Sequence, residues 1–394
     1  MTNLFNEIIV FIIGWMVLRY YLKKNHIVNR NFSLIYYSSY IISVIIILFS
    51  ARGSMHFGDG YGYYEQALSV IENQGVSIGT FLDFGIFFNA AQSWHFLPVW
   101  EFALFLVIFE STKCISIFHV ILMHISFIIW YKNFSLVGLA KSGKVAVIFM
   151  TLSLYLKNFT IPALKDPMVF FLSTVIIYNL IQFYYNLKLK QLVHTIIPIL
   201  VLIFTRMYIA AGLMVSLVLL VFYYIKIMYK KKNTFNALVL SCAIIIVMLI
   251  AMVAMLTTDV YAYALRWINE VDFGLVGIIF TIIGRFINFC FGPLFINIFT
   301  AQSLYYPCYV EAFIRTVGCL FLFKGIYLSK KMKNKGLLFV TIVLPMLISM
   351  VALEAGEQAS AIRQYMPFYP LLSILYAIGI TGLNVNYIQK NTKE

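Results

Sequence analysis

Charged residues are scarce in this chain of 394 residues, and only 11% are Asp, Glu, Lys or Arg. Soluble domains carry about 25% charged residues and about half apolar residues, whereas 62% of this chain is hydrophobic. Apolar stretches near the length of about 20 residues needed to cross a bilayer recur along it. We therefore exclude the water-soluble classes. The sequence predicts an all-α, polytopic transmembrane helix bundle of about 11–13 spans, with outer loops and re-entrant or interfacial helices.

Cysteine is also rare, and the five cysteines show neither a paired metal spacing nor a disulfide framework. No paired Asp-X-Asp motif occurs, so we expect no metal and no cofactor. The net charge of +14 is explained by lysine-rich cytoplasmic loops rather than by a nucleic-acid partner. The first apolar segment, residues 4–21, has no basic region before it and no cleavage site, which indicates a retained span.

Lysine clusters set the predicted topology, because they concentrate on the cytoplasmic side. With every cluster inside, the N-terminus lies outside. The predicted spans are 4–21, 34–50, 115–131, 145–157, 168–185, 192–205, 207–226, 236–257, 309–328, 336–353 and 367–383. The apolar stretches 96–110 and 276–299 do not fit as simple crossings and are interpreted as re-entrant or interfacial helices. The alternative, that both are full spans, places Lys188 and the lysine run at 230–232 outside. We expect one membrane domain over 1–394, with outer loops at 51–95 and 258–308.

Arginine is distributed differently from lysine. Six arginines fall in predicted outer loops or at outer span ends, namely Arg52, Arg206, Arg266, Arg285, Arg315 and Arg363. The planar guanidinium group binds phosphate bidentately, so an outer set of arginines is typical of a clamp for an anionic lipid headgroup such as a sugar phosphate. The alternative is that each arginine pairs with a loop carboxylate and only stabilises the fold.

The stretch "MHFGDGYGYYEQA", residues 55–67, brings three candidate bases into the first outer loop. A carboxylate or histidine within hydrogen-bond reach can deprotonate a sugar hydroxyl, and Asp59, His56 and Glu65 all qualify. Tyr61 and Tyr64 offer amphipathic rings that suit a sugar face. The alternative is a Gly-Asp-Gly turn followed by an interfacial aromatic belt.

Three further outer segments carry candidate residues. In "TIPALKDPMVFFL", Asp166 precedes Pro167 and caps the next span, which leaves Lys165 to meet a phosphate. Arg206 follows an apolar run shorter than the bilayer requires, and an ionisable residue at such depth is a functional candidate. In "EAGEQASAIRQYMPFYP", Arg363 follows Glu354 and Glu357, and pairing of Arg363 with Glu357 is the structural alternative.

These features together resemble a family. The outer Asp-bearing loop, the "KDP" before a span, the arginine after a short span and the terminal "RQYMPFYPLLSILYAIG" are similar to multi-span glycosyltransferases that use polyprenyl-phosphate-linked sugars. Within that group the layout most resembles Wzy-type O-antigen or capsule repeat-unit polymerases of the bacterial inner membrane. The resemblance concerns layout over nearly the whole chain. It lacks a sharp local motif.

The resemblance implies a reaction in which a glycan on undecaprenyl pyrophosphate is transferred to a new lipid-linked repeat unit at the periplasmic face. It assigns the pyrophosphate to Arg206, Arg285 and Arg363, which we extend to Arg52 and Lys165. It makes Asp59, by position, the base or a metal ligand, and Tyr61, Tyr64, Glu354 and Glu357 are expected to contact the glycan. Expected partners are the lipid-linked glycan, membrane lipids and a chain-length regulator protein. The alternatives are a polyprenyl-monophosphate-dependent glycosyltransferase and a flippase or transporter for lipid-linked sugars.

Overall fold

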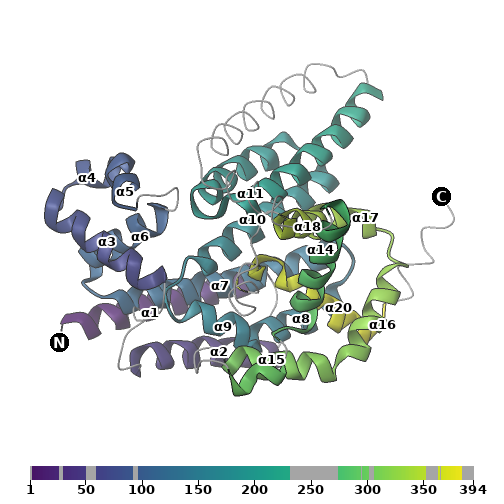
Figure 1. The fold of residues 1–394 in the computed structure, drawn as a ribbon, viewed down its shortest axis with the longest axis horizontal. Helices are drawn as coiled ribbons and strands as arrows, with labels where there is room; N and C mark the ends of the chain where they lie inside the picture. The colour runs from purple at the N-terminus through teal and green to yellow at the C-terminus, as the bar shows by residue number, and fades with distance from the viewer. Residues whose placement is uncertain are drawn as a thin grey trace. The chain divides into compact units, whose positions relative to one another are not determined.

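The computed structural model describes residues 2–25, 30–49, 59–91, 96–230, 274–293, 295–300, 306–351, 363 and 365–383. Within these ranges the chain is helical and forms no strand (Figure 1). Five of the helices are long and apolar enough to cross a membrane. Helices suit that environment because they satisfy every backbone hydrogen bond within the segment. The prediction of an all-α, multi-pass helix bundle is confirmed.

The first half of the chain forms eleven labelled helices. They are α1 (Thr2–Lys24), α2 (Arg30–Phe49), α3 (Asp59–Gln74), α4 (Ile78–Leu82), α5 (Phe84–Ala91), α6 (Phe96–Phe109), α7 (Thr112–Leu136), α8 (Ala140–Leu152), α9 (Leu154–Thr160), α10 (Asp166–Asn186) and α11 (Leu189–Lys230). Helices α1, α2, α7, α10 and α11 are the five candidate spans. Helices α1, α7 and α10 each contain one predicted span, and α2 covers the predicted span 34–50 up to Phe49. Helix α11 covers two predicted spans, 192–205 and 207–226, which form one long helix with a break at Arg206.

The second half is built from shorter pieces. They are α14 (Gly274–Phe291), η2 (Phe295–Phe299), α15 (Tyr306–Val317), α16 (Cys319–Ser329), α17 (Lys335–Leu338), the π-helical turn η4 (Phe339–Val343), α18 (Leu344–Val351), η5 (Met366–Phe368) and α20 (Tyr369–Thr381). Helices α15 and α16 together are as long as a span but bend by 64°. The predicted span 236–257 lies outside the described residues.

The predicted outer loops contain regular structure where they are described. Helices α3, α4 and α5 occupy most of residues 59–91, and α14 occupies part of 258–308. Helix α6 covers the stretch 96–110, and its axis makes an angle of 112° with that of α5, as in a broken span or a re-entrant loop. The alternative of a Gly-Asp-Gly turn does not describe Asp59 and Gly60, which begin helix α3, and Gly58 lies outside the described residues.

The chain divides into two compact units, 1–128 with 147–171 and 129–146 with 172–394. In the first unit, hydroxyl groups bind backbone carbonyl oxygens of neighbouring helices. Tyr40 Oη donates to Phe11 O (3.0 Å) and Tyr36 Oη donates to His124 O (2.8 Å). Such interhelical hydrogen bonds hold α2 against α1 and α7.

In the second unit, glycines allow two helix pairs to approach closely. Helices α16 and α20 lie side by side (Figure 1), and a Cβ added at Gly325 or Gly379 would collide with the backbone of the other helix. At the contact of α11 with α18, a Cβ on Gly212 would lie 2.6 Å from Pro345 O. Ser216 Oγ donates to Val340 O nearby (2.6 Å). Small residues at these positions are typical of helix packing in membranes.

Candidate functional site

Arg206 interrupts helix α11, as the short apolar run before it predicts. Its backbone angles, φ −153° and ψ 88°, are extended, so the 42 residues of α11 consist of two helical runs that meet at this residue. Arg206 is only 3% exposed. Its Nη1 atom donates to Tyr208 Oη (2.6 Å), and its guanidinium carbon lies 5.9 Å from the centroid of the Tyr208 ring. A buried guanidinium group therefore lies at a break in an apolar helix.

A second predicted arginine, Arg285, is buried on helix α14 with 7% of its surface exposed. It donates a hydrogen bond from Nη1 to the carbonyl oxygen of Met350, in the last turn of α18. It also interacts electrostatically with the side chain of Tyr365. A helix at this position agrees with the interpretation of 276–299 as a re-entrant or interfacial helix within the outer loop 258–308.

Helix α18 brings these two arginines into one cluster. Ser349 Oγ, next to Met350, donates to Tyr208 O (3.4 Å), and Tyr365 interacts electrostatically with Arg285 and Tyr208. Burial raises the pKa of Tyr365 to about 12, so its hydroxyl is neutral at physiological pH. We call Arg206, Tyr208, Arg285 and Tyr365 the arginine–tyrosine cluster. The half-buried Arg363 precedes Tyr365 by two positions in the sequence.

Two members of this cluster are absent from the residues expected from sequence. Tyr208 and Tyr365 each follow a predicted arginine by two positions, in "RMY" and "RQY". For Tyr208 the short spacing is a usable signal, because its hydroxyl accepts from the Arg206 guanidinium group and its ring faces that cation. Tyr365 interacts with Arg285, which is distant in sequence, so no local signal marks that pair.

Arg315 has a structural role and not a place in this cluster. Its Nη1 and Nη2 atoms donate to Phe289 O (3.1 Å) and Gly292 O (2.6 Å), which are carbonyl oxygens at the C-terminal end of α14. A cation at a helix C-terminus satisfies orphan acceptors and complements the helix dipole. Arg315 also lies 4.0 Å from the carboxylate of Glu311, which accepts a hydrogen bond from Tyr369. Arg315 therefore stabilises the fold, which is the alternative to binding a phosphate group.

In the first unit, two predicted outer segments contact one another. The Lys165 ammonium group lies over the Tyr63 ring, 5.7 Å from its centroid. A Cβ on Gly60 would lie 3.2 Å from Pro162 O, so the start of α3 packs against the turn before α10. Lys165 and Asp166 are both buried, at 8% and 2% exposure. Asp166 begins α10, where the helix dipole favours a carboxylate.

The other predicted residues of the first unit are spread over helix α3. Glu65 is exposed and accepts a hydrogen bond from Tyr61, whose pKa it raises. Tyr64 faces a different region and lines a cleft at the ends of α1 and α7. Asp59 is the first residue of the helix. Four other predicted site residues lie outside the described part of the chain: His56, Arg52, Glu354 and Glu357.

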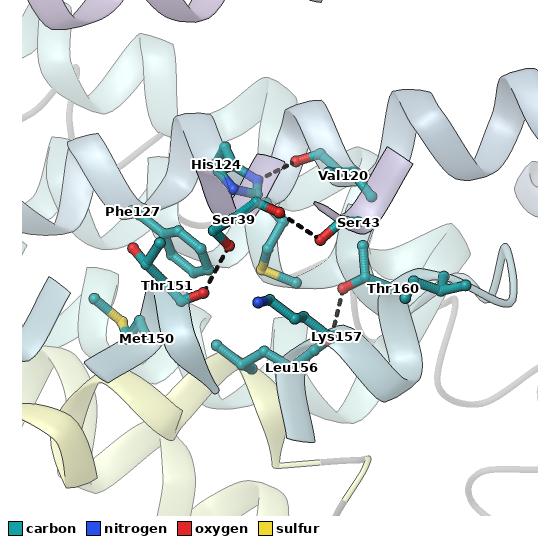
Figure 2. Close-up of a pocket in the computed structure, with 12 residues that line it drawn as sticks. Ser39, Ser43, Val120, His124, Phe127, Met150, Thr151, Leu156, Lys157 and Thr160 are labelled. Carbon is teal, nitrogen blue, oxygen red and sulfur yellow. Dashed lines mark hydrogen bonds between the residues drawn. The ribbon is translucent and has the colours of Figure 1, made fainter. Parts of the chain in front are cut away.

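A small pocket within the first unit also contains a lysine. Lys157 extends into a pocket between α2, α7 and the α8–α9 break, close to Ser39, Ser43 and Thr160 (Figure 2). The cavity volume is about 10 Å³, which is enough for about one water molecule. The hydroxyl groups of Ser39, Ser43 and Thr160 donate to backbone carbonyl oxygens. This pocket is too small for a sugar.

The same unit contains a buried pair of ionisable side chains. His119 Nε2 lies 3.0 Å from Glu101 Oε1, and the two side chains are 0% and 4% exposed. The pair joins α6 to α7 in the interior. Because it has no opening to substrate, we assign it a role in packing.

Among the residues that the structure describes, no group of three or more His, Cys, Asp or Glu side chains is placed to hold a metal ion. Comparison with protein-family models, with curated proteins and with solved structures finds no match. The candidate functional sites are therefore the arginine–tyrosine cluster and the polar surfaces of the first unit.

Proposed function

We propose that this protein polymerises oligosaccharide repeat units carried on undecaprenyl pyrophosphate, at the periplasmic face of the bacterial inner membrane. The observation that carries the proposal is the clustering of Arg206 and Arg285 around the end of α18. An ionisable side chain buried in a membrane protein is a candidate functional residue. A planar guanidinium group binds phosphate bidentately, so two of them in one cluster suit a lipid-linked diphosphate at the membrane surface.

The reaction is a glycosyl transfer. A hydroxyl oxygen of the acceptor sugar attacks the anomeric carbon of the donor glycan, and the bond from that carbon to the pyrophosphate oxygen breaks. The electron pair leaves with undecaprenyl pyrophosphate, whose developing charge Arg206 and Arg285 neutralise, with Arg363 as a third candidate two positions before Tyr365. The hydroxyl proton passes to a carboxylate or histidine base, for which Asp59, His56 and Glu65 are the candidates.

Deletion of the gene in the source bacterium distinguishes this reaction from its alternatives. A polymerase mutant loses the long polysaccharide ladder on a gel and accumulates complete single repeat units on lipid in the outer leaflet. A flippase mutant retains those units in the inner leaflet. Loss of a monophosphate-dependent glycosyltransferase leaves a repeat unit that lacks a sugar, which mass spectrometry detects.

Complementation then tests the cluster. Arg206→Ala and Arg285→Ala are expected to lose long ladders at normal protein levels. Arg30→Ala is the matched control, because Arg30 is exposed at the start of α2 and outside the cluster. Normal ladders from both cluster variants would overturn the assignment of the pyrophosphate to these residues.

A further inference from the structure

A polar cleft opens at one end of the first unit, where α1, α2 and α7 meet. The cavity volume is about 490 Å³, within the range of about 300–1,000 Å³ typical of ligand pockets. Three hydrogen bonds fix this end: Asn6 Nδ2 to Phe109 O (2.9 Å), Ser111 Oγ to Glu7 Oε1 (2.7 Å) and Lys113 Nζ to Leu48 O (2.8 Å). The cleft is therefore held by contacts between distant parts of the chain.

The lining of the cleft combines carboxylates with an aromatic ring. Glu7 lies in the second turn of the first membrane helix and is only 6% exposed, an expensive position for an ionisable side chain. Glu110 is exposed at the rim, and Tyr64 of α3 forms part of the wall. Ionised carboxylates accept strong hydrogen bonds from hydroxyl groups, and a tyrosine ring packs on an apolar sugar face.

The charges of the lining limit the ligand class. Two carboxylates face one ammonium group, that of Lys113, which already donates to Leu48 O. The surplus negative charge disfavours a phosphate or pyrophosphate group and favours a neutral or amino sugar. The cleft therefore differs in its chemistry from the arginine–tyrosine cluster of the other unit.

The ends of the helices also indicate which compartment the cleft faces. Helix α1 ends at Lys23 and Lys24, α2 begins at Arg30, and α7 carries Lys132 near its other end. The cleft lies at the opposite ends of these three helices. Because basic residues mark the cytoplasmic side, the sequence predicts that the cleft faces outward.

We propose that this cleft is a carbohydrate subsite that binds the sugar end of the acceptor glycan through Glu7, Glu110 and Tyr64. The identity of the ligand as the acceptor rests on the proposed polymerase function, whereas binding of a phosphate-free sugar rests on the cleft alone. Of the bases predicted from the sequence, Glu65 is exposed on helix α3 next to Tyr64 and does not itself line the cleft.

Calorimetric titration of the full chain in nanodiscs tests the subsite. The probe is the free oligosaccharide of one repeat unit, released from the source bacterium's own surface polysaccharide and carrying no lipid or phosphate. Wild type is expected to bind it. Glu110→Gln and Tyr64→Ala are each expected to weaken binding about tenfold or more, because each removes a direct contact. Glu72→Gln, an exposed glutamate of α3 that does not line the cleft, is expected to bind like wild type.

Two results overturn the subsite: no binding to wild type, or unchanged binding to both Glu110→Gln and Tyr64→Ala. Glu110 is exposed, so its variant folds even if Glu7→Gln does not. The polymer ladder of the deletion strain separates this proposal from the polymerase function. Binding that depends on the cleft, together with a normal ladder after deletion, refutes the polymerase and leaves the subsite standing. Loss of the ladder after deletion, together with no sugar binding to the wild-type protein, supports the polymerase function and refutes the subsite.

Discussion

The ammonium group of Lys165 lies over the ring of Tyr63, 5.7 Å from its centroid, and this contact joins helix α3 to the turn before α10. Both side chains belong to segments that the sequence marks as candidate outer-face elements. A cation–π contact contributes about 0.5–2 kcal/mol, more when the cation is desolvated, as the 8% exposure of Lys165 indicates.

We therefore predict energetic coupling between these two residues. In a double-mutant cycle of Lys165→Met and Tyr63→Leu, thermal unfolding in detergent is expected to give a coupling energy of about 0.5–2 kcal/mol. Tyr63→Phe keeps the aromatic ring and should retain most of the coupling energy. The exposed Tyr61 provides the control, because Tyr61→Leu should not couple with Lys165→Met. A coupling energy of zero would show that the contact does not contribute to stability.

The second prediction concerns the contact between α16 and α20. Gly325 lies against the backbone of Leu375, and Gly379 lies against that of Phe321, so an added methyl group has no space on either side. Gly325→Ala and Gly379→Ala should each destabilise the protein by about 1–3 kcal/mol, the usual cost of overpacking, measured as a lower melting temperature in detergent.

Gly284 of α14 supplies the matched control for these glycines. A Cβ at this position would meet no atom within 4 Å, and the residue lies in a helix. Gly284→Ala should therefore leave stability unchanged or raise it slightly, because alanine has the higher helix propensity. If all three substitutions behaved alike, the close approach of α16 and α20 would be wrong.

The third prediction concerns the buried pair Glu101 and His119. His119→Ala removes the hydrogen-bond partner of a carboxylate that is 4% exposed and is expected to cost about 3–5 kcal/mol of stability. Replacing both residues, as in the double variant Glu101→Leu with His119→Phe, should recover most of that loss, because no ionisable group is then left buried. Thermal unfolding of the three proteins measures this. A double variant as unstable as His119→Ala would assign the pair a role beyond packing.

The sequence predicts the long helices of this fold well, because an apolar run such as that of α2 or α10 leaves few alternatives in a membrane. It also predicts the break at Arg206, since the run before it is too short for a span. Contacts between distant segments could not be predicted in this way. Nothing local in "NEII" indicates that Glu7 meets Ser111, and nothing in "FKGI" indicates that Gly325 contacts α20.

The arginines illustrate the same limit at the level of the candidate site. Topology places Arg206, Arg285 and Arg315 alike near the outer face, and the resemblance assigns the pyrophosphate to Arg206 and Arg285 but not to Arg315. The structure separates them by their partners. Arg206 and Arg285 have tyrosine partners beside α18, whereas Arg315 binds the carbonyl oxygens that end α14. Which partner an arginine finds depends on tertiary packing and has no local signature.

The fourth prediction uses this difference to separate a structural arginine from a functional one. Arg315→Lys keeps the charge at the end of α14 but loses the fork that spans Phe289 O and Gly292 O, so a loss of stability of about 1–2 kcal/mol is expected. The folded fraction should still make normal polysaccharide ladders. Arg285→Lys can still donate to Met350 O, so its stability should change less.

The activity of Arg285→Lys should nevertheless fall about tenfold or more, because an ammonium group cannot bind a phosphate bidentately. Activity is measured as the amount of long polysaccharide made per amount of folded protein. Stability is measured as the melting temperature in detergent of the same variants. The expected pattern is reciprocal: Arg315→Lys loses stability and Arg285→Lys loses activity. If both variants lost stability and activity in proportion, the guanidinium group of Arg285 would have the same helix-packing role as that of Arg315, and the pyrophosphate would have to be bound elsewhere.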